Sequence, residues 1–290
     1  MIPGRFAYRR AGSIEEAIAI LEQHGADAKL LSGGQSLIPL MKFRLVEPAV
    51  LVDINRISGL DRLEEQNGQL VIGSLVRESV LERSPLIRQR YPILADTAEV
   101  IADPLVRNLA TVGGNLAHGD PANDHPATML ALRAEVVARG PQGERVIPID
   151  DFFIDTFATA LGPDELLTEV RIPAPPPRSG GAYLKFERKV GDYAVAAAAV
   201  FLVLDSEGKI ARAGIGLTNV HYKPLRAEAA EKVLLGQHPS DDVFRTAAEL
   251  AAQASDPTSD LRGPAEYKRA VARTMTFRAL RRAWNRALAA

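Results

Sequence analysis

The sequence contains no cysteine among its 290 residues. Without a thiol the chain forms no disulfide, offers no thiolate to a metal ion and cannot ligate an iron–sulfur cluster through cysteine. Any iron–sulfur cluster that works with this protein must therefore sit in another chain.

Long apolar runs and an excess of one charge are also lacking. The formal net charge is −1, which gives no reason to expect nucleic acid or an anionic membrane as a partner. The longest apolar stretch, residues 194–204, is far shorter than the about 20 residues that cross a bilayer as a helix. Arg9 and Arg10 form a twin arginine, but no hydrophobic run follows them. The sequence therefore predicts a cytoplasmic protein with no membrane span.

Several catalytic motifs are absent as well. The sequence has no G-x-G-x-x-G, no P-loop and no H-E-x-x-H, so neither a Rossmann domain nor a kinase is supported. His118, Asp120, Asp124 and His125 lie close together in the sequence, but Pro121 interrupts any helical register among them. We therefore favour structural or cofactor-contact roles for these residues over a metal site.

What is present predicts an α+β chain. Residues 13–16 fit a capping box that opens a short helix ending at Gly25. Strand-like runs at 29–31 and 50–54 then enclose a second helix, which makes a small β-α-β unit. Asn67-Gly68 predicts a hairpin, and helical spacing continues from 78 to 102.

The second half of the sequence predicts one further α+β unit and a final domain. A helix is expected at 126–132, with strands at 134–138 and 145–149. Prolines at 173–177 mark the clearest boundary, and hydrophobicity alone leaves residues 194–204 open between helix and strand. We expect three parts, residues 1–57, 58–177 and 178–290.

Two glycine-centred stretches share one plan, Ser32-Gly33-Gly34-Gln35-Ser36 and Thr111-Val112-Gly113-Gly114-Asn115. A single glycine pair is equally typical of a tight turn, but two matched stretches suit a pyrophosphate. We expect the glycines to use backbone angles forbidden to other residues and to expose amide N–H groups, with flanking hydroxyl and amide groups as further donors. The sequence predicts a strand-to-helix turn for the first stretch and a long irregular connection for the second.

These stretches also carry a family resemblance. The chain resembles the FAD-binding medium subunit of the molybdenum hydroxylases, the xanthine dehydrogenase family, and is most similar to the medium subunit of aerobic carbon monoxide dehydrogenase. The resemblance rests on residues 33–42, 52–54, 72–74, 106–115, 118–126, 151–153, 185–193, 217–220 and 260–263. It implies a two-lobed FAD-binding module of the vanillyl-alcohol-oxidase type, followed by a C-terminal antiparallel sheet with helices, and it favours strand for residues 194–204.

The resemblance also implies roles for single residues. Asp124 matches a position that contacts the ribose or diphosphate region of FAD, Leu161 one that packs on the isoalloxazine ring, and Lys185 and Tyr193 positions that approach the ring. The alternative to a cofactor-binding role is that residues 185–193 form a charged surface hairpin with a structural role only. The expected FAD-binding residues, with no catalytic or metal-binding residue among them, are Ser32, Gly33, Gly34, Gln35, Ser36, Thr111, Val112, Gly113, Gly114, Asn115, Asp124, Leu161, Lys185 and Tyr193.

The implied function is electron transfer. FAD would be held without a covalent link and would pass electrons from two-iron, two-sulfur clusters of a small subunit to an external acceptor, while a large subunit holds the molybdenum cofactor. The implied assembly is a dimer of heterotrimers, through which the chain would reach the inner face of a membrane. Alternatives are the medium subunit of a hydroxylase acting on an aldehyde or N-heterocycle, a non-catalytic FAD-binding protein, and a self-sufficient flavin oxidase, which is disfavoured because no large substrate domain remains.

Overall fold

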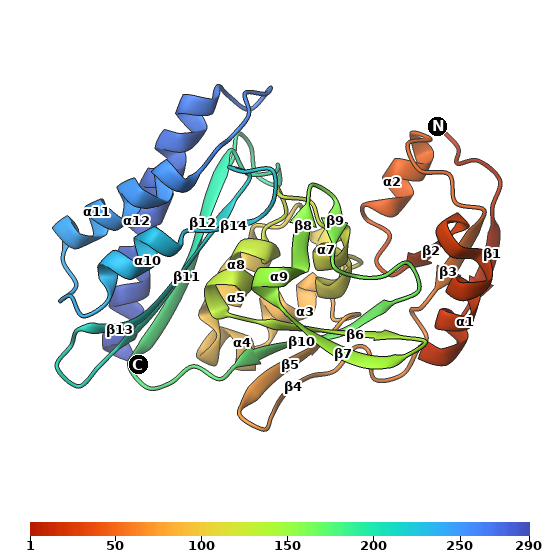
Figure 1. The fold of residues 1–290 in the computed structure, drawn as a ribbon, viewed down its shortest axis with the longest axis horizontal. Helices are drawn as coiled ribbons and strands as arrows, with labels where there is room; N and C mark the ends of the chain where they lie inside the picture. Colours follow the sequence, from red (N-terminus) through yellow and green to blue (C-terminus); the bar gives the residue numbers. More distant parts are fainter.

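The computed structural model describes residues 1–290 and arranges them around three main sheets that follow one another along the molecule (Figure 1). The N-terminal part (red to orange) lies at one end, the middle part (yellow to green) in the centre and the C-terminal part (blue) at the other end. Helices accompany both parallel and antiparallel sheets, which confirms the predicted α+β class.

The N-terminal part is a three-stranded parallel sheet in the order β1-β3-β2, with α1 packed against one face. The Ser13 hydroxyl accepts a hydrogen bond from the Glu16 N–H (3.1 Å), so the predicted capping residue does begin α1. Leu21 of α1 is buried in one cluster with Val52 of β3. The elements are β1 (Ala7–Arg10), α1 (Ile14–His24), a 3₁₀ turn (Gly25–Asp27), β2 (Ala28–Leu31), α2 (Leu37–Lys42) and β3 (Val50–Asp53).

The middle part is built on a five-stranded antiparallel sheet in the order β4-β5-β10-β6-β7. Asn67 and Gly68 have φ of +53° and +76° and close the β4–β5 hairpin, as their sequence predicts. A two-stranded ribbon, β8 with β9, precedes the long strand β10. The strands are β4 (Leu63–Gln66), β5 (Gln69–Gly73), β6 (Glu135–Gly140), β7 (Gly143–Pro148), β8 (Phe153–Asp155), β9 (Ala158–Thr159) and β10 (Leu166–Pro173).

The helices of the middle part cover its sheet and divide the helical stretch that the sequence predicts at 78–102. Pro85 and Pro92 each occupy the first position of a new helix, where a proline N–H would have no partner in any case. The helices are α3 (Glu78–Arg83), α4 (Pro85–Arg90), α5 (Pro92–Glu99), α6 (Pro104–Arg107), α7 (Val112–His118), α8 (His125–Leu132) and α9 (Ile149–Phe152).

The C-terminal part is an antiparallel meander whose alanine-rich stretch is strand β12, as the family resemblance favours. Helices α10 to α12 cover one face of this sheet, and α5 and α8 of the middle part pack against it from the opposite side. The elements are β11 (Ser179–Phe186), β12 (Ala196–Leu204), β13 (Ile210–Thr218), β14 (Leu225–Arg226), α10 (Glu228–Leu234), α11 (Asp241–Ala254) and α12 (Ala265–Ala289).

Small residues in this sheet let helices come very close to it. A Cβ on Gly214 or Gly216 would lie 2.9 or 2.7 Å from carbonyl carbons of α8, and one on Gly180 would lie 2.5 Å from a backbone nitrogen of α12. Real Cβ atoms do not approach backbone atoms that closely, so only glycine fits there. The alanines of β12 leave room for helices that pack on both faces of the sheet. They do not make this segment itself helical.

Candidate functional site

The two glycine stretches, far apart in the sequence, meet in space. The Ser32 and Thr111 hydroxyls lie 2.8 Å apart and share a hydrogen bond. A Cβ on Gly33 would come within 2.9 Å of the Ala110 Cα and closer still to the Leu109 carbonyl oxygen. Glycine at position 33 is thus required for one stretch to contact the segment that leads into the other.

The first stretch, residues 32–36, is the strand-to-helix turn that the sequence predicts, between β2 and α2. The backbone N–H groups of residues 33–37 donate no hydrogen bond to any other group of the chain. Gly34 has φ +72°, a left-handed conformation that favours glycine, and the Ser36 hydroxyl makes no capping bond. The turn therefore presents a run of free amide donors, which is the chemistry that an anion such as a phosphate requires.

The second stretch differs from its prediction. Residues 112–115 open helix α7 instead of lying in an irregular crossing, and Thr111 caps that helix by accepting a hydrogen bond from the Gly114 N–H (3.2 Å). The Val112 and Gly113 N–H groups donate to carbonyl oxygens of residues 76 and 74 (3.0 and 3.1 Å). The expectation of free amide groups is wrong here because the helix start and the segment that follows strand β5 already accept their hydrogen bonds. Of the polar side chains, Asn115 keeps a buried Oδ1 without a partner.

The expectation that all four glycines use forbidden backbone angles is also wrong. Only Gly34 has a positive φ. A Cβ on Gly113 would lie 2.5 Å from the Ser74 Cβ, and one on Gly114 would lie 2.7 Å from the Thr111 hydroxyl. Three of the four glycines are therefore needed for close packing between segments rather than for backbone conformation.

Sequence reasoning missed two residues that join the stretches. The Asn55 side chain donates to the Ser32 carbonyl oxygen (2.9 Å), and its own Oδ1 accepts from Arg77 (2.6 Å). The other guanidinium nitrogen of Arg77 donates to the Leu109 carbonyl oxygen. Partial burial lowers the pKa of Arg77, while the nearby Asp53 opposes this shift. No sequence motif or periodicity relates position 55 to position 77. The hydrogen bonds by which Asn55 and Arg77 connect the two glycine stretches could therefore not be predicted from the sequence.

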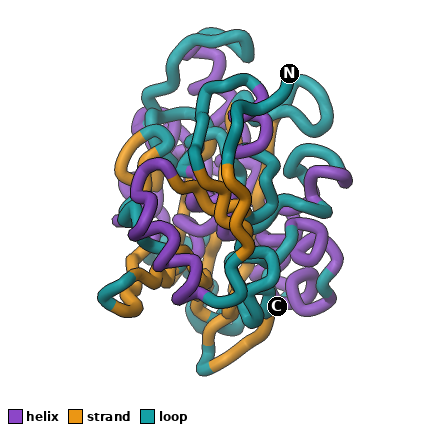
Figure 2. Tube along the Cα trace, turned by 90° about the vertical axis from the view of Figure 1, so that its right-hand side faces the viewer, coloured by secondary structure: helices purple, strands orange, loops and turns teal.

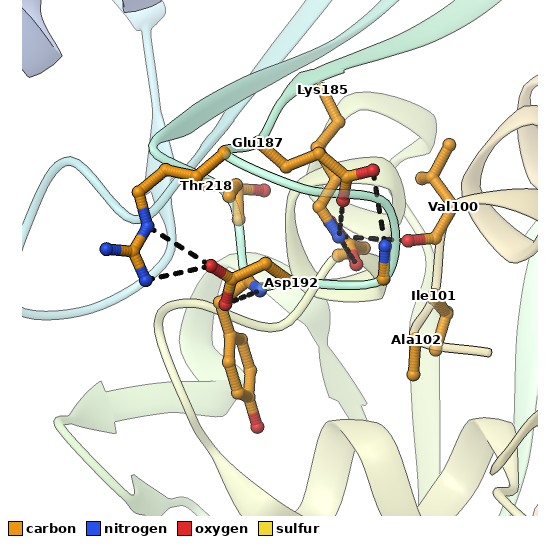
Figure 3. A network of polar contacts seen from close by, with 12 residues as sticks. Val100, Ile101, Ala102, Lys185, Glu187, Asp192 and Thr218 are labelled. Carbon is orange, nitrogen blue, oxygen red and sulfur yellow. Dashed lines mark hydrogen bonds and ion pairs between the residues drawn. The ribbon is translucent and has the colours of Figure 1, made fainter. Parts of the chain in front are cut away.

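Asp124 and Lys185, which the resemblance relates to FAD, form a buried ion pair (Nζ–Oδ2 3.0 Å) between α8 and β11. The Lys185 ammonium also donates to the Val100 carbonyl oxygen (2.9 Å) and lies 3.5 Å from a Glu187 oxygen (Figure 3). Burial raises the pKa of Asp124, and the Lys185 charge acts against that rise. The Lys185 ammonium thus donates two hydrogen bonds within the chain and faces a second carboxylate, that of Glu187.

Tyr183 is a third residue that the sequence did not single out. Its buried hydroxyl donates to Asp124 and lies 3.3 Å from the Thr218 hydroxyl. Burial, followed by the neighbouring Asp124, raises the pKa of Tyr183 well above its usual value. The alternation of β11 places Tyr183 and Lys185 on one face of the strand, and that spacing is the signal that was available in the sequence.

Tyr193 lies on the loop that connects β11 and β12 and is 42% exposed. Its neighbour Asp192 accepts hydrogen bonds from Arg188 (3.1 Å) and Arg262 (2.9 Å), and these bonds, Arg262 first, lower the pKa of Asp192 to about 2. The Arg262 guanidinium also lies 5.5 Å from the centre of the Tyr193 ring. The 185–193 segment is therefore a hairpin connection fixed by ion pairs, with Tyr193 at its surface.

Leu161 lies between β9 and β10, half-buried against the main hydrophobic cluster. Among the predicted site residues, residues 32–36 thus contact residues 111–115 through the Ser32–Thr111 hydrogen bond. Asp124 contacts Lys185 through an ion pair. Cofactor contacts of Leu161 and of every other residue named above remain predictions.

Comparison with known proteins identifies the chain. Residues 4–175 match the family described as FAD binding domain in molybdopterin dehydrogenase, and residues 181–283 match the CO dehydrogenase flavoprotein C-terminal domain. The chain belongs to the FAD-binding medium subunits of the molybdenum hydroxylases. It is accordingly an FAD-binding oxidoreductase subunit, and the family resemblance seen in the sequence is confirmed.

Individual relatives agree with this assignment. The carbon monoxide dehydrogenase medium chain of Hydrogenophaga pseudoflava is 45% identical over 99% of both chains. A solved structure of that organism's carbon monoxide dehydrogenase superposes with a TM-score of 0.96 at 47% identity, again over 99% of both chains. Quinoline 2-oxidoreductase of Pseudomonas putida 86 superposes with a TM-score of 0.93 at 33% identity, covering 99% of this chain and 100% of the other. No helix here is both long and apolar enough to cross a membrane.

Proposed function

We propose that this chain is the FAD-carrying electron-transfer subunit of a carbon monoxide dehydrogenase-type complex. The observation that carries the proposal is the run of free amide N–H groups at residues 33–37, next to the Ser32–Thr111 hydroxyl pair. Backbone amide and hydroxyl groups can bind the oxygens of an FAD diphosphate without a charged side chain, so the residues present fit the cofactor. The similarity to a carbon monoxide dehydrogenase medium chain over nearly the whole length supports the type of complex.

In this proposal the chain holds FAD without a covalent bond, through residues 32–36 and 111–115 together with Asp124, Leu161, Lys185 and Tyr193. FAD supplies the electron-carrying chemistry when bound, and the protein supplies its grip and orientation. Lys185 is held by Asp124 and the Val100 carbonyl, so its charge stays in a fixed position. The three groups of strands support a division into residues 1–57, 58–177 and 178–290, with FAD held between the first two parts.

The assembly that follows is a heterotrimer, paired into a dimer of heterotrimers, in the cytoplasm. A small subunit would hold two-iron, two-sulfur clusters, and a large subunit would hold the molybdenum cofactor. This chain then needs no substrate chemistry of its own, and its electrons leave to an external acceptor. The similarity to quinoline 2-oxidoreductase favours, as a second candidate, a complex that oxidises an N-heterocycle.

The test is purification of the intact complex through a tag on this chain. We expect FAD, molybdenum and iron in the complex, flavin release on acid treatment, and bleaching of the flavin absorbance by carbon monoxide. The same measurement with quinoline decides between the two candidates. A chain that binds FAD but purifies without iron or molybdenum would contradict the proposal and favour a non-catalytic FAD-binding protein.

A further inference from the structure

Tyr183 is only 2% exposed and lies where the middle part meets the C-terminal sheet. Its side chain extends from β11, and its hydroxyl donates a hydrogen bond to Oδ1 of Asp124 at the start of α8. The Thr218 hydroxyl at the end of β13 lies 3.3 Å from the Tyr183 hydroxyl. Because the Tyr183 proton is directed to Asp124, the Thr218 hydroxyl is left to donate to the Tyr183 oxygen. Two buried hydroxyl groups thus form a chain of hydrogen bonds that ends at one carboxylate.

Asp124 occupies the N-cap position of α8, where an aspartate side chain ordinarily accepts a hydrogen bond from the backbone of its own helix. Here the side chain makes no such bond. Its Oδ1 accepts from Tyr183, and its Oδ2 accepts from the Lys185 ammonium at 3.0 Å. The carboxylate therefore connects two side chains of β11 instead of capping its helix.

The two carboxylates that face Lys185 are held in different ways (Figure 3). Glu187 lies 3.5 Å from the Lys185 ammonium through Oε2, and this oxygen has no hydrogen-bond partner. The other oxygen of Glu187 accepts from the Gly191 N–H (3.3 Å), which belongs to the connection between β11 and β12. Asp124 is instead fixed by the buried Tyr183 hydroxyl and lies nearer to Lys185. Tyr183 therefore holds the carboxylate that most directly balances the Lys185 charge.

We propose that Tyr183 is a positioning residue that sets the reduction potential of the flavin. It acts through Asp124, because it holds one oxygen of this carboxylate while the other oxygen fixes the Lys185 ammonium. This inference rests on the proposed function, in which Lys185 approaches the flavin ring. The hydrogen bond from Tyr183 offsets part of the Asp124 charge, so more of the Lys185 charge stabilises the electron-rich reduced ring.

These contacts lie apart from the glycine stretch that offers free amide groups. Residues 32–36 belong to the N-terminal part, which faces the viewer in Figure 2. Helix α8 and strand β11 lie farther from that end of the molecule (Figure 1). A change at Tyr183 should therefore alter the flavin potential and leave the grip of residues 32–36 on the diphosphate intact.

The main test compares Tyr183→Phe with Tyr91→Phe in the purified complex that contains FAD. Tyr91 is a matched control, because it is also 2% exposed and its hydroxyl donates to Glu65 (2.7 Å), a carboxylate that pairs with Arg90. A redox titration at the wild-type midpoint potential should show the ratio of reduced to oxidised flavin lowered by about threefold or more in Tyr183→Phe. Flavin content should stay within about twofold of the wild type, and Tyr91→Phe should change neither quantity.

Asp124→Asn shows whether Tyr183 acts through Asp124. The amide oxygen still accepts from Tyr183, but the side chain carries no charge, so the ratio of reduced to oxidised flavin should rise. When Tyr183→Phe is added to Asp124→Asn, it should lower the ratio by a smaller factor than it does in the wild type, because no carboxylate charge remains to be offset. Thr218→Val removes the second hydroxyl and should lower the ratio less than Tyr183→Phe does.

Thermal unfolding of each variant separates stability from the effect on the flavin. If Tyr183→Phe and Tyr91→Phe both lower the melting temperature and leave the potential unchanged, Tyr183 has a structural role only, and the inference is wrong while the proposed function stands. Equal effects of Tyr183→Phe with and without Asp124→Asn would also overturn the inference. If Tyr183→Phe does not fold, Thr218→Val decides, and an unchanged potential in that variant counts against the inference. A wild-type complex without FAD would contradict the proposed function itself.

Discussion

The two glycine stretches have similar residue types in the same order, but their backbone amide groups have different roles in the structure. Residues 32–36 form a turn whose amide groups are left without partners, whereas residues 111–115 begin a helix whose first amide groups donate to Thr111 and to carbonyl oxygens of residues 74 and 76. Gly34 is needed for its backbone angle, and Gly113 is needed because Ser74 leaves no room for a Cβ. A similar arrangement of residue types therefore does not imply a similar contact, and the first stretch carries most of the donors available to a phosphate.

The largest expected effect comes from Gly33→Ala, which affects both stretches at once. The new Cβ would collide with backbone of residues 109 and 110, so the two stretches would have to separate. We expect loss of most FAD and a free energy of unfolding lower by about 1–3 kcal/mol, as for other overpacked sites. Bound flavin and thermal unfolding measure the two effects. Gly12→Ala, whose Cβ would meet only a flexible side chain at 3.4 Å, is the control and should resemble the wild type.

Gly113→Ala separates the two roles. Its Cβ would clash with Ser74 but would remove no free amide donor, so the free energy of unfolding should fall by about 1–3 kcal/mol. Each chain that remains folded should still bind FAD with nearly wild-type affinity, as titration at low temperature would show. A loss of FAD affinity as large as that of Gly33→Ala would mean that the stretches do not differ as the structure indicates.

Replacing one hydroxyl at a time gives a smaller, matched contrast. Thr111→Ala removes the cap of α7 and should lower the free energy of unfolding by about 1 kcal/mol. Ser32→Ala removes no cap, so its main effect should be on FAD, with a dissociation constant raised about tenfold for one lost hydrogen bond to a charged group. Equal melting temperatures for the two variants would contradict the difference in roles.

Tyr193→Ala should have the smallest effect on FAD retention, because the diphosphate contacts at the glycine stretches provide most of the anchoring. The lost stacking surface is worth about 1–3 kcal/mol by analogy with bases stacked on aromatic side chains. We expect near-normal flavin content, a shifted flavin reduction potential and altered acceptor-dependent turnover of the complex. A redox titration that shows no shift would place Tyr193 away from the ring and leave residues 185–193 as a surface hairpin.

Local rules were sufficient for elements that depend on neighbouring residues. The Ser13 cap and the Asn67-Gly68 hairpin follow from short-range geometry, and both occur as predicted. The pairing of the two glycine stretches also agrees with the hypothesis of one shared ligand. In each case the residues that decide the structure lie within a few positions of one another or repeat a recognisable pattern.

Features that depend on distant partners were not available from the pattern. The amide groups of Val112 and Gly113 are used because the segment that follows strand β5 lies beside them, and no local signal reports that contact. Asn55 and Arg77 bridge the stretches through carbonyl oxygens, which carry no sequence signature. The choice between helix and strand for the alanine-rich β12 was ambiguous for the same reason. Its small side chains allow helices to pack on both faces of the sheet, and those helices are distant in the sequence.

The hydrophobic cluster of the middle part continues into the C-terminal sheet through Tyr183, Ala197, Ala199 and Phe201. Prolines at 173–177 thus join two pieces that share one interior, although separate family descriptions match the pieces on either side. Because the two pieces share this interior, we expect them to unfold together. A protease cut within residues 174–178 would leave both fragments held together, and neither fragment would keep its apolar surface covered alone.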